Sequence, residues 1–311
     1  DCLPLGIPQL DDWALGPARG ELHLFIASPK RGKSWWLIHV GKRALLHRHN
    51  VCYVTLEISE EQIIQRFIQS LFSVQRTKAR VNVVRIKADN MGRMLKLDRD
   101  TLRNRLSLKD NTTRKHLATE LGKFHAGENL VVKGFPTGAL TVSGLRAYLD
   151  SLERTENFTP AFLIVDYPDL MRVDPRNYRL ELGTIFKDLR GIASERNIGV
   201  VVATQSNRAG ASARLMTDVH TSEDYSKVFT ADTVITYNQS IAEKELGLAR
   251  LFVSNTRVGD SDRFVVLISQ AYPVGQFCLD SALMTKTYDS HLEALGGKPL
   301  KDDDLPPEDV S

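Results

Sequence analysis

Long hydrophobic runs are missing from this sequence of 311 residues. None approaches the ~20 apolar residues that a membrane-spanning helix requires, and the first residues do not resemble a signal peptide. Cysteine is scarce too, because Cys2, Cys52 and Cys278 are far apart and lack the spacing of metal ligands. These absences argue against a membrane protein and a disulfide scaffold, and they predict a cytoplasmic protein.

Net charge is low as well, at +3, but it is distributed unevenly. Residues 76–126 contain 14 Lys/Arg against 5 Asp/Glu, a local charge of +9, so the rest of the chain carries −6. The last eleven residues contain five acidic side chains and one lysine. The basic block is either a solvated helical surface or a site for phosphate or an acidic partner.

Internal repeats are absent, whereas short apolar runs rich in β-branched residues are frequent. Such continuous runs are typical of buried parallel strands, and helical patterns separate the early ones. The expected strands are 22–27, 51–56, 130–133, 161–165, 199–204, 233–237, 251–254 and 264–269, and the expected helices are 34–49, 59–72, 142–155 and 180–196. The order predicts an α/β fold with a mostly parallel sheet, helices on both faces and antiparallel strands at one edge.

One stretch interrupts this alternation of strands and helices. We interpret residues 73–128 as a basic helical insertion, with short amphipathic helices over 98–108 and 112–124. The expected organisation is therefore one α/β domain over residues 1–296, which includes this insertion, followed by an acidic tail over residues 297–311.

A phosphate-binding loop follows the first expected strand. The loop consists of Ala27, Ser28, Pro29, Lys30, Arg31, Gly32, Lys33 and Ser34, and it is a P-loop in which alanine replaces the first glycine. Backbone N–H groups at the start of a helix surround a phosphate, Lys33 reaches the β- and γ-phosphates, and the Ser34 hydroxyl holds Mg²⁺. The preceding strand and the following helix argue against a chance match, and the loop predicts ATP and Mg²⁺ as cofactors.

Three polar residues at expected strand ends complete a candidate catalytic site. Asp166 ends the strand 161–165 and is a candidate ligand of Mg²⁺. Glu57 ends the strand that we expect next to the P-loop strand, where it would orient the attacking water; alternatively, it is a helix-cap carboxylate beside Ser59. Gln205 ends the strand 199–204 and either senses the γ-phosphate or is an ordinary polar strand end.

These motifs together resemble the motor domain of DnaB-type hexameric replicative helicases, within the RecA-like superfamily. The resemblance covers about residues 6–270 in family order. It rests on the sequences GIPQLD at 6–11, ASPKRGKS at 27–34, TLEIS at 55–59, DYPDLMR at 166–172, TQSNR at 204–208 and the segment 222–232.

The resemblance implies an ATP-dependent helicase that acts on single-stranded DNA as a hexameric ring, in a bacterium or a phage-infected host. It also implies that Arg257 reaches a neighbour's γ-phosphate as an arginine finger, whereas Asn255 stands where the family usually has a lysine. The residues expected to contact DNA are Arg172, Arg176, Arg179, Arg208 and Arg214, unless their two loops are merely solvated.

Two other functions remain open from the sequence. One is a regulatory or DNA-binding ATPase of the RecA/KaiC type, which assembles without unwinding; the other is a ring subunit that uses nucleotide only for assembly. The basic insertion or the acidic tail is a candidate site for a replication protein. The tail is also expected to compete with nucleic acid for basic surfaces.

Overall fold

The computed structural model describes residues 2–103, 106–124, 126–206, 215–216, 226–256 and 264–297. Within this part of the chain, nine strands form one sheet in the order β11-β10-β9-β8-β1-β7-β6-β2-β5. The strands are β1 (Leu22–Ala27), β2 (Val51–Thr55), β5 (Leu130–Gly134), β6 (Phe162–Asp166), β7 (Gly199–Gln205), β8 (Thr233–Asn238), β9 (Leu248–Thr256), β10 (Val265–Ser269) and β11 (Ser281–Leu283). Strands β5, β2, β6, β7, β1 and β8 are parallel, and β9, β10 and β11 extend the sheet in antiparallel fashion.

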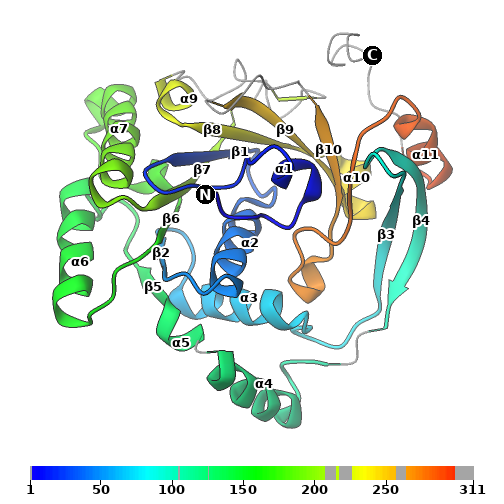
Figure 1. Cartoon of the computed structure of the whole chain (residues 1–311), viewed down its shortest axis with the longest axis horizontal. Coiled ribbons are helices and arrows are strands. Elements are labelled where there is room, and N and C mark those ends of the chain that lie inside the picture. Colours follow the sequence, from blue (N-terminus) through cyan, green and yellow to red (C-terminus); the bar gives the residue numbers. More distant parts are fainter. Residues whose placement is uncertain are drawn as a thin grey trace.

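Helices cover both faces of this sheet, as Figure 1 shows for α2 and α3 on one side and α6 and α7 on the other. The helices are α1 (Pro8–Asp11), α2 (Lys33–Leu46), α3 (Glu60–Phe72), α4 (Asn111–Phe124), α5 (Ala126–Asn129), α6 (Val142–Thr155), α7 (Tyr178–Arg196), α9 (Ser226–Thr230), α10 (Ile241–Leu246) and α11 (Tyr288–Ala294). Short 3₁₀ turns are η1 (Pro168–Leu170), η2 (Pro175–Asn177) and η4 (Tyr272–Val274).

Alternation of side chains along the strands explains the two cores. In β1, Phe25 faces α2 and stacks on Trp36 with ring centroids 4.7 Å apart, whereas Leu24 and Ile26 belong to the core under α6 and α7. Successive strand residues point to opposite faces, so a strand that is buried on both sides is apolar throughout. This is why continuous apolar runs identified these strands correctly, and why the α/β prediction is confirmed.

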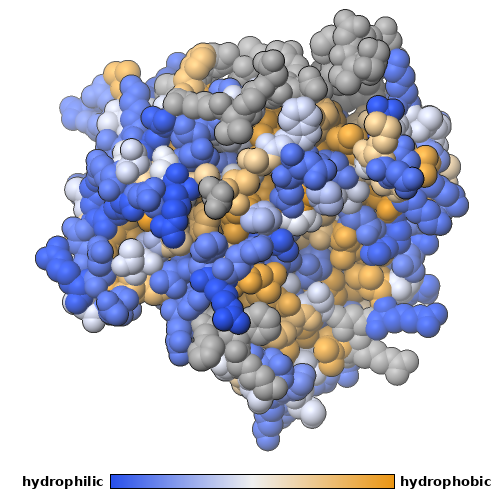
Figure 2. Space-filling model, viewed as in Figure 1, coloured by the Kyte–Doolittle hydropathy of each residue, from blue (hydrophilic) through white to orange (hydrophobic). Residues whose placement is uncertain are grey.

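The surface over α6 and α7 is mostly hydrophilic on the face seen in Figure 2. Figure 2 shows mostly hydrophilic residues over the region of α6 and α7, while hydrophobic residues show nearer the middle of the same face. The apolar residues of both helices pack with strand residues in the core instead. Among the described residues, no helix is both long enough and apolar enough to cross a membrane.

The insertion differs from the sequence-based expectation. The helix predicted over 112–124 is present as α4, but the helix predicted over 98–108 is wrong: β3 (Val81–Ala88) and β4 (Met94–Leu102) form an antiparallel hairpin instead. The connecting turn is stabilised by Asp89, whose side chain accepts hydrogen bonds from the backbone of Met91 and Arg93, and by Gly92 at φ +74°. The insertion is thus a basic hairpin followed by a helix.

The hairpin is a strand pair because it is buried against the rest of the fold. Val84, Ile86, Met94 and Leu97 pack with residues of β9–β11 and with Tyr288 of α11, as part of one apolar cluster. Near these strands the Arg85 guanidinium lies 3.2 Å from the Asp280 carboxylate. Tertiary packing against residues far along the chain therefore decides the local structure here.

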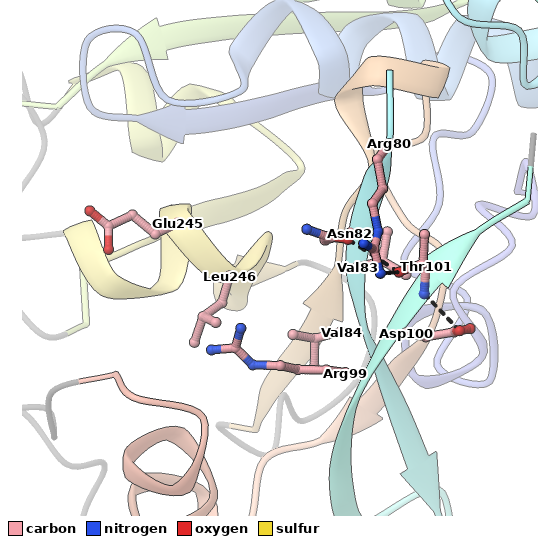
Figure 3. A pocket seen from close by; sticks show the side chains of 9 residues that line it. All are labelled: Arg80, Asn82, Val83, Val84, Arg99, Asp100, Thr101, Glu245 and Leu246. Atoms are coloured by element: carbon pink, nitrogen blue, oxygen red, sulfur yellow. Dashed lines mark hydrogen bonds between the residues drawn. The ribbon is translucent and has the colours of Figure 1, made fainter. Parts of the chain in front are cut away.

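A cavity of about 500 Å³ lies between this hairpin and α10. Figure 3 shows Arg80 and Arg99 on the hairpin side and Leu246 of α10 opposite them, with the Glu245 carboxylate pointing away. None of the residues predicted to bind nucleotide lines this cavity. The cavity therefore belongs to the insertion and is separate from the P-loop.

Candidate active site

The predicted site residues come together at the carboxyl ends of the parallel strands. The P-loop follows β1, Gln205 ends the neighbouring β7, and Asp166 ends β6, which lies next to β7. Residue pairing places Ala27 beside Gln205 and Thr55 beside Asp166. Ligands of open α/β sheets bind at this edge, where loops leave the strands.

The P-loop is held from two sides. The Arg31 guanidinium donates hydrogen bonds to the carbonyl oxygens of Gln239, at 2.7 Å, and Ser240, at 3.2 Å, just beyond β8. On the other side, the hydroxyls of Ser28 and Ser206 lie 3.2 Å apart. These contacts attach the loop to the ends of both strands that flank β1, so its shape is fixed by the sheet.

Gly32 is the residue at which the loop turns into α2. It has φ +72°, and a Cβ atom built on it would lie 2.6 Å from the Tyr272 hydroxyl. That hydroxyl accepts a hydrogen bond of 2.7 Å from the Gln270 side chain. Both the backbone conformation and the close approach of Tyr272 therefore require glycine.

We expect Gly32→Ala to destabilise the chain by about 1–2 kcal/mol, the usual cost of a left-handed residue with a side chain. Nucleotide affinity should also fall about tenfold, which corresponds to a loss of about 1.4 kcal/mol in binding free energy. Denaturant unfolding and titration with a fluorescent ATP analogue measure the two effects. Adding Tyr272→Phe, which removes the hydroxyl, should restore part of the stability. Equal stability of Gly32→Ala and the unchanged chain would show that this close approach does not constrain the loop.

Lys33 lies at the start of α2 and is 7% exposed. Burial lowers its pKa, while the carboxylates of Glu57, Asp166 and Asp169 act in the opposite direction. Its ammonium also lies 5.4 Å from the centroid of the Tyr167 ring. A buried ammonium that directly follows the phosphate-binding loop is suited to neutralise an anionic group at the mouth of that loop.

Asp166 is completely buried, and its two carboxylate oxygens differ. Oδ2 accepts a hydrogen bond of 2.7 Å from the Tyr53 hydroxyl, whereas Oδ1 has no hydrogen-bond partner among the described residues. Burial raises the pKa of Asp166, and hydrogen bonding from Tyr53 and Ser34 opposes this rise. A buried carboxylate oxygen without a partner, close to a serine hydroxyl, fits a Mg²⁺ ion whose other ligands are phosphate and water.

We expect Asp166→Asn to stabilise the chain at pH 7 in the absence of metal and nucleotide. The pKa of Asp166 is raised in the folded chain. Its contribution to stability is therefore fully present below the ordinary value of 3.8, where Asp166 is protonated, and is lost as pH rises through the folded pKa. Asparagine cannot ionise and retains an oxygen for Tyr53. Unfolding in EDTA should therefore show a gain at pH 7 that disappears near the ordinary pKa, with exposed Asp12→Asn as control. A loss of stability at pH 7 would contradict this account.

Glu57 occupies a different place in the sheet from the one expected. Strand β2 does not neighbour β1, because β7 and β6 lie between them, so the predicted adjacency is wrong. Glu57 is nevertheless close enough for its carboxylate to oppose the lowering of the Lys33 pKa. The cap of α3 is Ser59, whose hydroxyl accepts from the backbone N–H of Gln62 at 3.4 Å. Glu57 is exposed, which leaves its carboxylate accessible to water.

Gln205 contacts a residue that the sequence did not single out. Its side-chain amide donates a hydrogen bond of 2.8 Å to the hydroxyl of Tyr167, directly after Asp166. Arg66 of α3 is a second unforeseen neighbour, since its guanidinium acts to lower the pKa of Asp166 and lies 5.2 Å from the Trp35 ring. The only sequence signal for Tyr167 was its position in the segment DYPDLMR at 166–172, and no signal pointed to Arg66.

The arginines predicted to contact nucleic acid differ in their local structure and in their hydrogen-bond partners. Arg172 is exposed after η1, and Arg179 is exposed in the first turn of α7 rather than in a loop. Arg176 is exposed too, but its guanidinium forms hydrogen bonds of 3.2 and 2.9 Å with the Asp174 carboxylate. A phosphate would therefore compete with an internal partner at Arg176.

Several predicted residues fall outside the described part of the chain. These are Arg208, Arg214, Arg257 and the acidic residues 302–309. Asn255 is described: it lies near the end of β9, paired with Val234. Asn255 is the penultimate residue of this strand, and it lies two residues before Arg257, the predicted arginine finger.

The fold and the loop together define a P-loop protein with a RecA-like α/β core. The chain belongs to the family of the DnaB-like helicase C terminal domain, whose model matches residues 2–271. It is 27% identical over 206 residues to the replicative DNA helicase DnaB of Haemophilus influenzae, and 26% identical over 195 residues to the DnaB-like replicative helicase of Enterobacteria phage T4. These alignments cover 65% and 61% of this chain, but only 38% and 36% of the two relatives.

Solved structures show the same fold at lower identity. One solved ATPase domain superposes with a TM-score of 0.67 at 17% identity, covering 89% of this chain and 91% of that domain. A DnaB-like replicative helicase, solved in a study of its interactions with primase, also gives 0.67, at 16% identity and with 92% and 62% coverage. These similarities confirm the RecA-like fold expected from the sequence.

Proposed function

We propose that this chain is the ATP-hydrolysing motor of a replicative helicase that moves along single-stranded DNA as a hexameric ring. The observation that carries the proposal is the position of Lys33. Its ammonium is buried at the start of α2, directly after the loop, and the charges of Glu57, Asp166 and Asp169 oppose the lowering of its pKa by burial. The chain belongs to the DnaB-like helicase family, and this arrangement suits the hydrolysis of ATP that we propose for it.

Each residue of the site has a role in this proposal. The backbone of residues 27–34 surrounds the phosphates of ATP, and Lys33 neutralises charge on the β- and γ-phosphates. Ser34 would hold Mg²⁺ together with the Asp166 oxygen that has no partner among the described residues, and the ion would supply positive charge beside the phosphates. Glu57 orients the attacking water, and Gln205, whose amide donates a hydrogen bond to Tyr167, senses the γ-phosphate.

Contacts between subunits and with DNA complete the proposal. Arg257 reaches the γ-phosphate of a neighbouring subunit, and Arg172, Arg176, Arg179, Arg208 and Arg214 contact the phosphates of single-stranded DNA. Backbone contacts of this kind do not read sequence and weaken with salt. The basic insertion or the acidic tail recruits a replication protein such as the primase of the related structure.

A second function is favoured by one residue. Asn255 stands where the family usually has a lysine, and the loss of one of two cations facing the γ-phosphate would slow hydrolysis. The chain would then be an ATPase that assembles on DNA without unwinding it.

The rate of ATP hydrolysis with and without single-stranded DNA separates these functions from a purely structural role. A motor is expected to be stimulated by DNA and to displace a paired strand. Stimulation without displacement would favour an assembling ATPase, and the absence of both would favour a structural subunit.

A further inference from the structure

The cavity between the hairpin and α10 has hydrogen-bond donors gathered on one wall. Asn82 of β3 pairs with Thr101 of β4. Successive residues of a strand point to opposite faces, so Arg80 and Arg99, each two residues before a member of this pair, lie on the same face of the hairpin. All four residues line the cavity, as Figure 3 shows. The register of the hairpin thus brings two guanidinium groups and one amide to the same wall.

Internal hydrogen bonds fix the direction of these donors. The Arg80 guanidinium donates to the Thr101 hydroxyl at 3.5 Å, and that hydroxyl donates to Oδ1 of Asn82 at 3.1 Å. Because Oδ1 of Asn82 is occupied in this way, its amide nitrogen is directed toward α10, as Figure 3 shows. Arg99 donates to the carbonyl oxygen of Leu295, just after α11, at 2.7 Å. A guanidinium has five N–H donors, so both arginines keep donors for a further partner.

The two acidic residues that line the cavity do not neutralise these arginines. Asp100 lies on the opposite face of β4 from Thr101, and its carboxylate accepts from the backbone N–H of Thr101 at 2.7 Å. The Glu245 carboxylate points away from the cavity in Figure 3. Within the described part of the chain, neither Arg80 nor Arg99 has a carboxylate partner.

The lining of the cavity suits a ligand that is anionic at one end and apolar at the other. Guanidinium groups bind carboxylates through pairs of parallel hydrogen bonds. The wall opposite the two arginines is formed by Leu246 of α10, which a small inorganic anion would leave uncovered. An extended peptide with a carboxylate next to an apolar side chain satisfies both walls.

The chain carries such a sequence a few residues beyond the cavity. The last described residue is Gly297, and the sequence continues as KPLKDDDLPPEDVS over residues 298–311. A Cβ atom built on Gly296 would lie 4.0 Å from the Arg99 guanidinium, so the chain passes the cavity just before this segment. Asp302 is five residues beyond Gly297, and five extended residues span up to about 17 Å. This length is sufficient for the acidic residues to return to the cavity.

We propose that the cavity is a docking site for the segment DDDL at 302–305 of the same chain. Its carboxylates pair with Arg80 and Arg99, and its leucine packs against Leu246. The two prolines that follow restrict the backbone to extended conformations and so reduce the entropy lost on docking. Exposed ion pairs are individually weak, but the short connection to α11 gives the segment a high effective concentration at the cavity. The inference does not depend on the proposed function.

The test measures binding of a fluorescein-labelled peptide, with the sequence of residues 298–311, to the full chain by fluorescence anisotropy at low salt. In the unchanged chain the segment 302–305 competes with the peptide. Asp302→Asn/Asp303→Asn/Asp304→Asn in the protein removes this competition, so the peptide should bind at least fivefold more tightly. The control Asp12→Asn/Glu61→Gln/Glu156→Gln removes three exposed carboxylates elsewhere and should change the affinity less than twofold.

A second pair of variants, made in the chain with the three Asp→Asn changes, locates the site. Arg80→Gln/Arg99→Gln should weaken peptide binding at least fivefold. Lys87→Gln/Lys96→Gln removes the same charge from the same hairpin, but these lysines pair with Asp98 and do not line the cavity. Their replacement should weaken binding less than twofold. Melting temperatures show whether each variant is folded, and Asn82→Ala, a milder change in the same wall, should weaken binding about threefold.

Two results would overturn the inference. Equal peptide affinity of the unchanged chain and the chain with the three Asp→Asn changes would show that the segment does not occupy the cavity. Equal weakening by the arginine and lysine replacements would show a general attraction between opposite charges, which salt screens, in place of a site. These measurements need neither ATP nor DNA, so their failure leaves the proposed function intact.

Discussion

Replacement of Lys33 by alanine is expected to lower the rate of ATP hydrolysis at least a hundredfold, the usual effect of removing one group that stabilises the transition state. The charges of Glu57, Asp166 and Asp169, which now oppose the lowering of the Lys33 pKa, would remain without this buried cation. Arg31 cannot replace it, because its guanidinium is bound to the carbonyl oxygens of Gln239 and Ser240. Steady-state release of phosphate measures the effect.

Two controls make the result specific. The melting temperature shows whether Lys33→Ala is folded, and Lys187→Ala removes an equally basic side chain from the exposed face of α7. The Lys187 variant should hydrolyse ATP at the original rate. If Lys33→Ala also hydrolyses ATP at that rate, the loop at residues 27–34 is not the phosphate-binding loop.

Replacement of Glu57 by glutamine should separate binding from turnover. We expect the turnover number to fall by about 10²–10³-fold, within the range that general-base groups contribute, while ATP affinity changes less than threefold. Glutamine preserves the shape of the side chain but does not draw a proton from water as a carboxylate does. Single-turnover hydrolysis and titration with a fluorescent ATP analogue give the two quantities.

The control for this variant lies one turn further along the chain. Glu61 is exposed in the first turn of α3, so Glu61→Gln removes the same charge without removing the candidate base. It should hydrolyse ATP normally. Loss of ATP binding in folded Glu57→Gln would assign Glu57 a structural role instead.

The sheet could be predicted well from the sequence because its strands are buried on both faces. The expected strand 22–27 and the expected helix 142–155 coincide with β1 and α6, and the other runs differ by a few residues at their ends. A P-loop carries its own context, since the strand before it and the helix after it are both adjacent in sequence. Local patterns were sufficient for these parts.

Strand order and the insertion required information that is not local. Strand β2 lies beyond β6 because of the crossover connections, and the residues near Glu57 give no indication of this position. The hairpin β3–β4 packs into two apolar clusters, and its partners on β9–β11, η4 and α11 lie far along the chain. In retrospect, Val81, Val83 and Val84 before the Asp89–Gly92 turn were the available signal.

The buried ion pair between Lys227 and Asp169 could not be predicted for a similar reason. The two residues are 58 positions apart, and no local pattern links them. The same holds for Tyr53, whose hydrogen bond to Asp166 spans 113 positions. Pairings of this kind are set by the three-dimensional fold and carry no motif.

The most direct test of the proposed function is strand displacement from a forked DNA duplex with a free single-stranded arm. The account predicts release of the paired strand when ATP and Mg²⁺ are present. It predicts no release with a non-hydrolysable ATP analogue or with Lys33→Ala. Hydrolysis of ATP that is stimulated by single-stranded DNA, without release of the strand under any of these conditions, would contradict it.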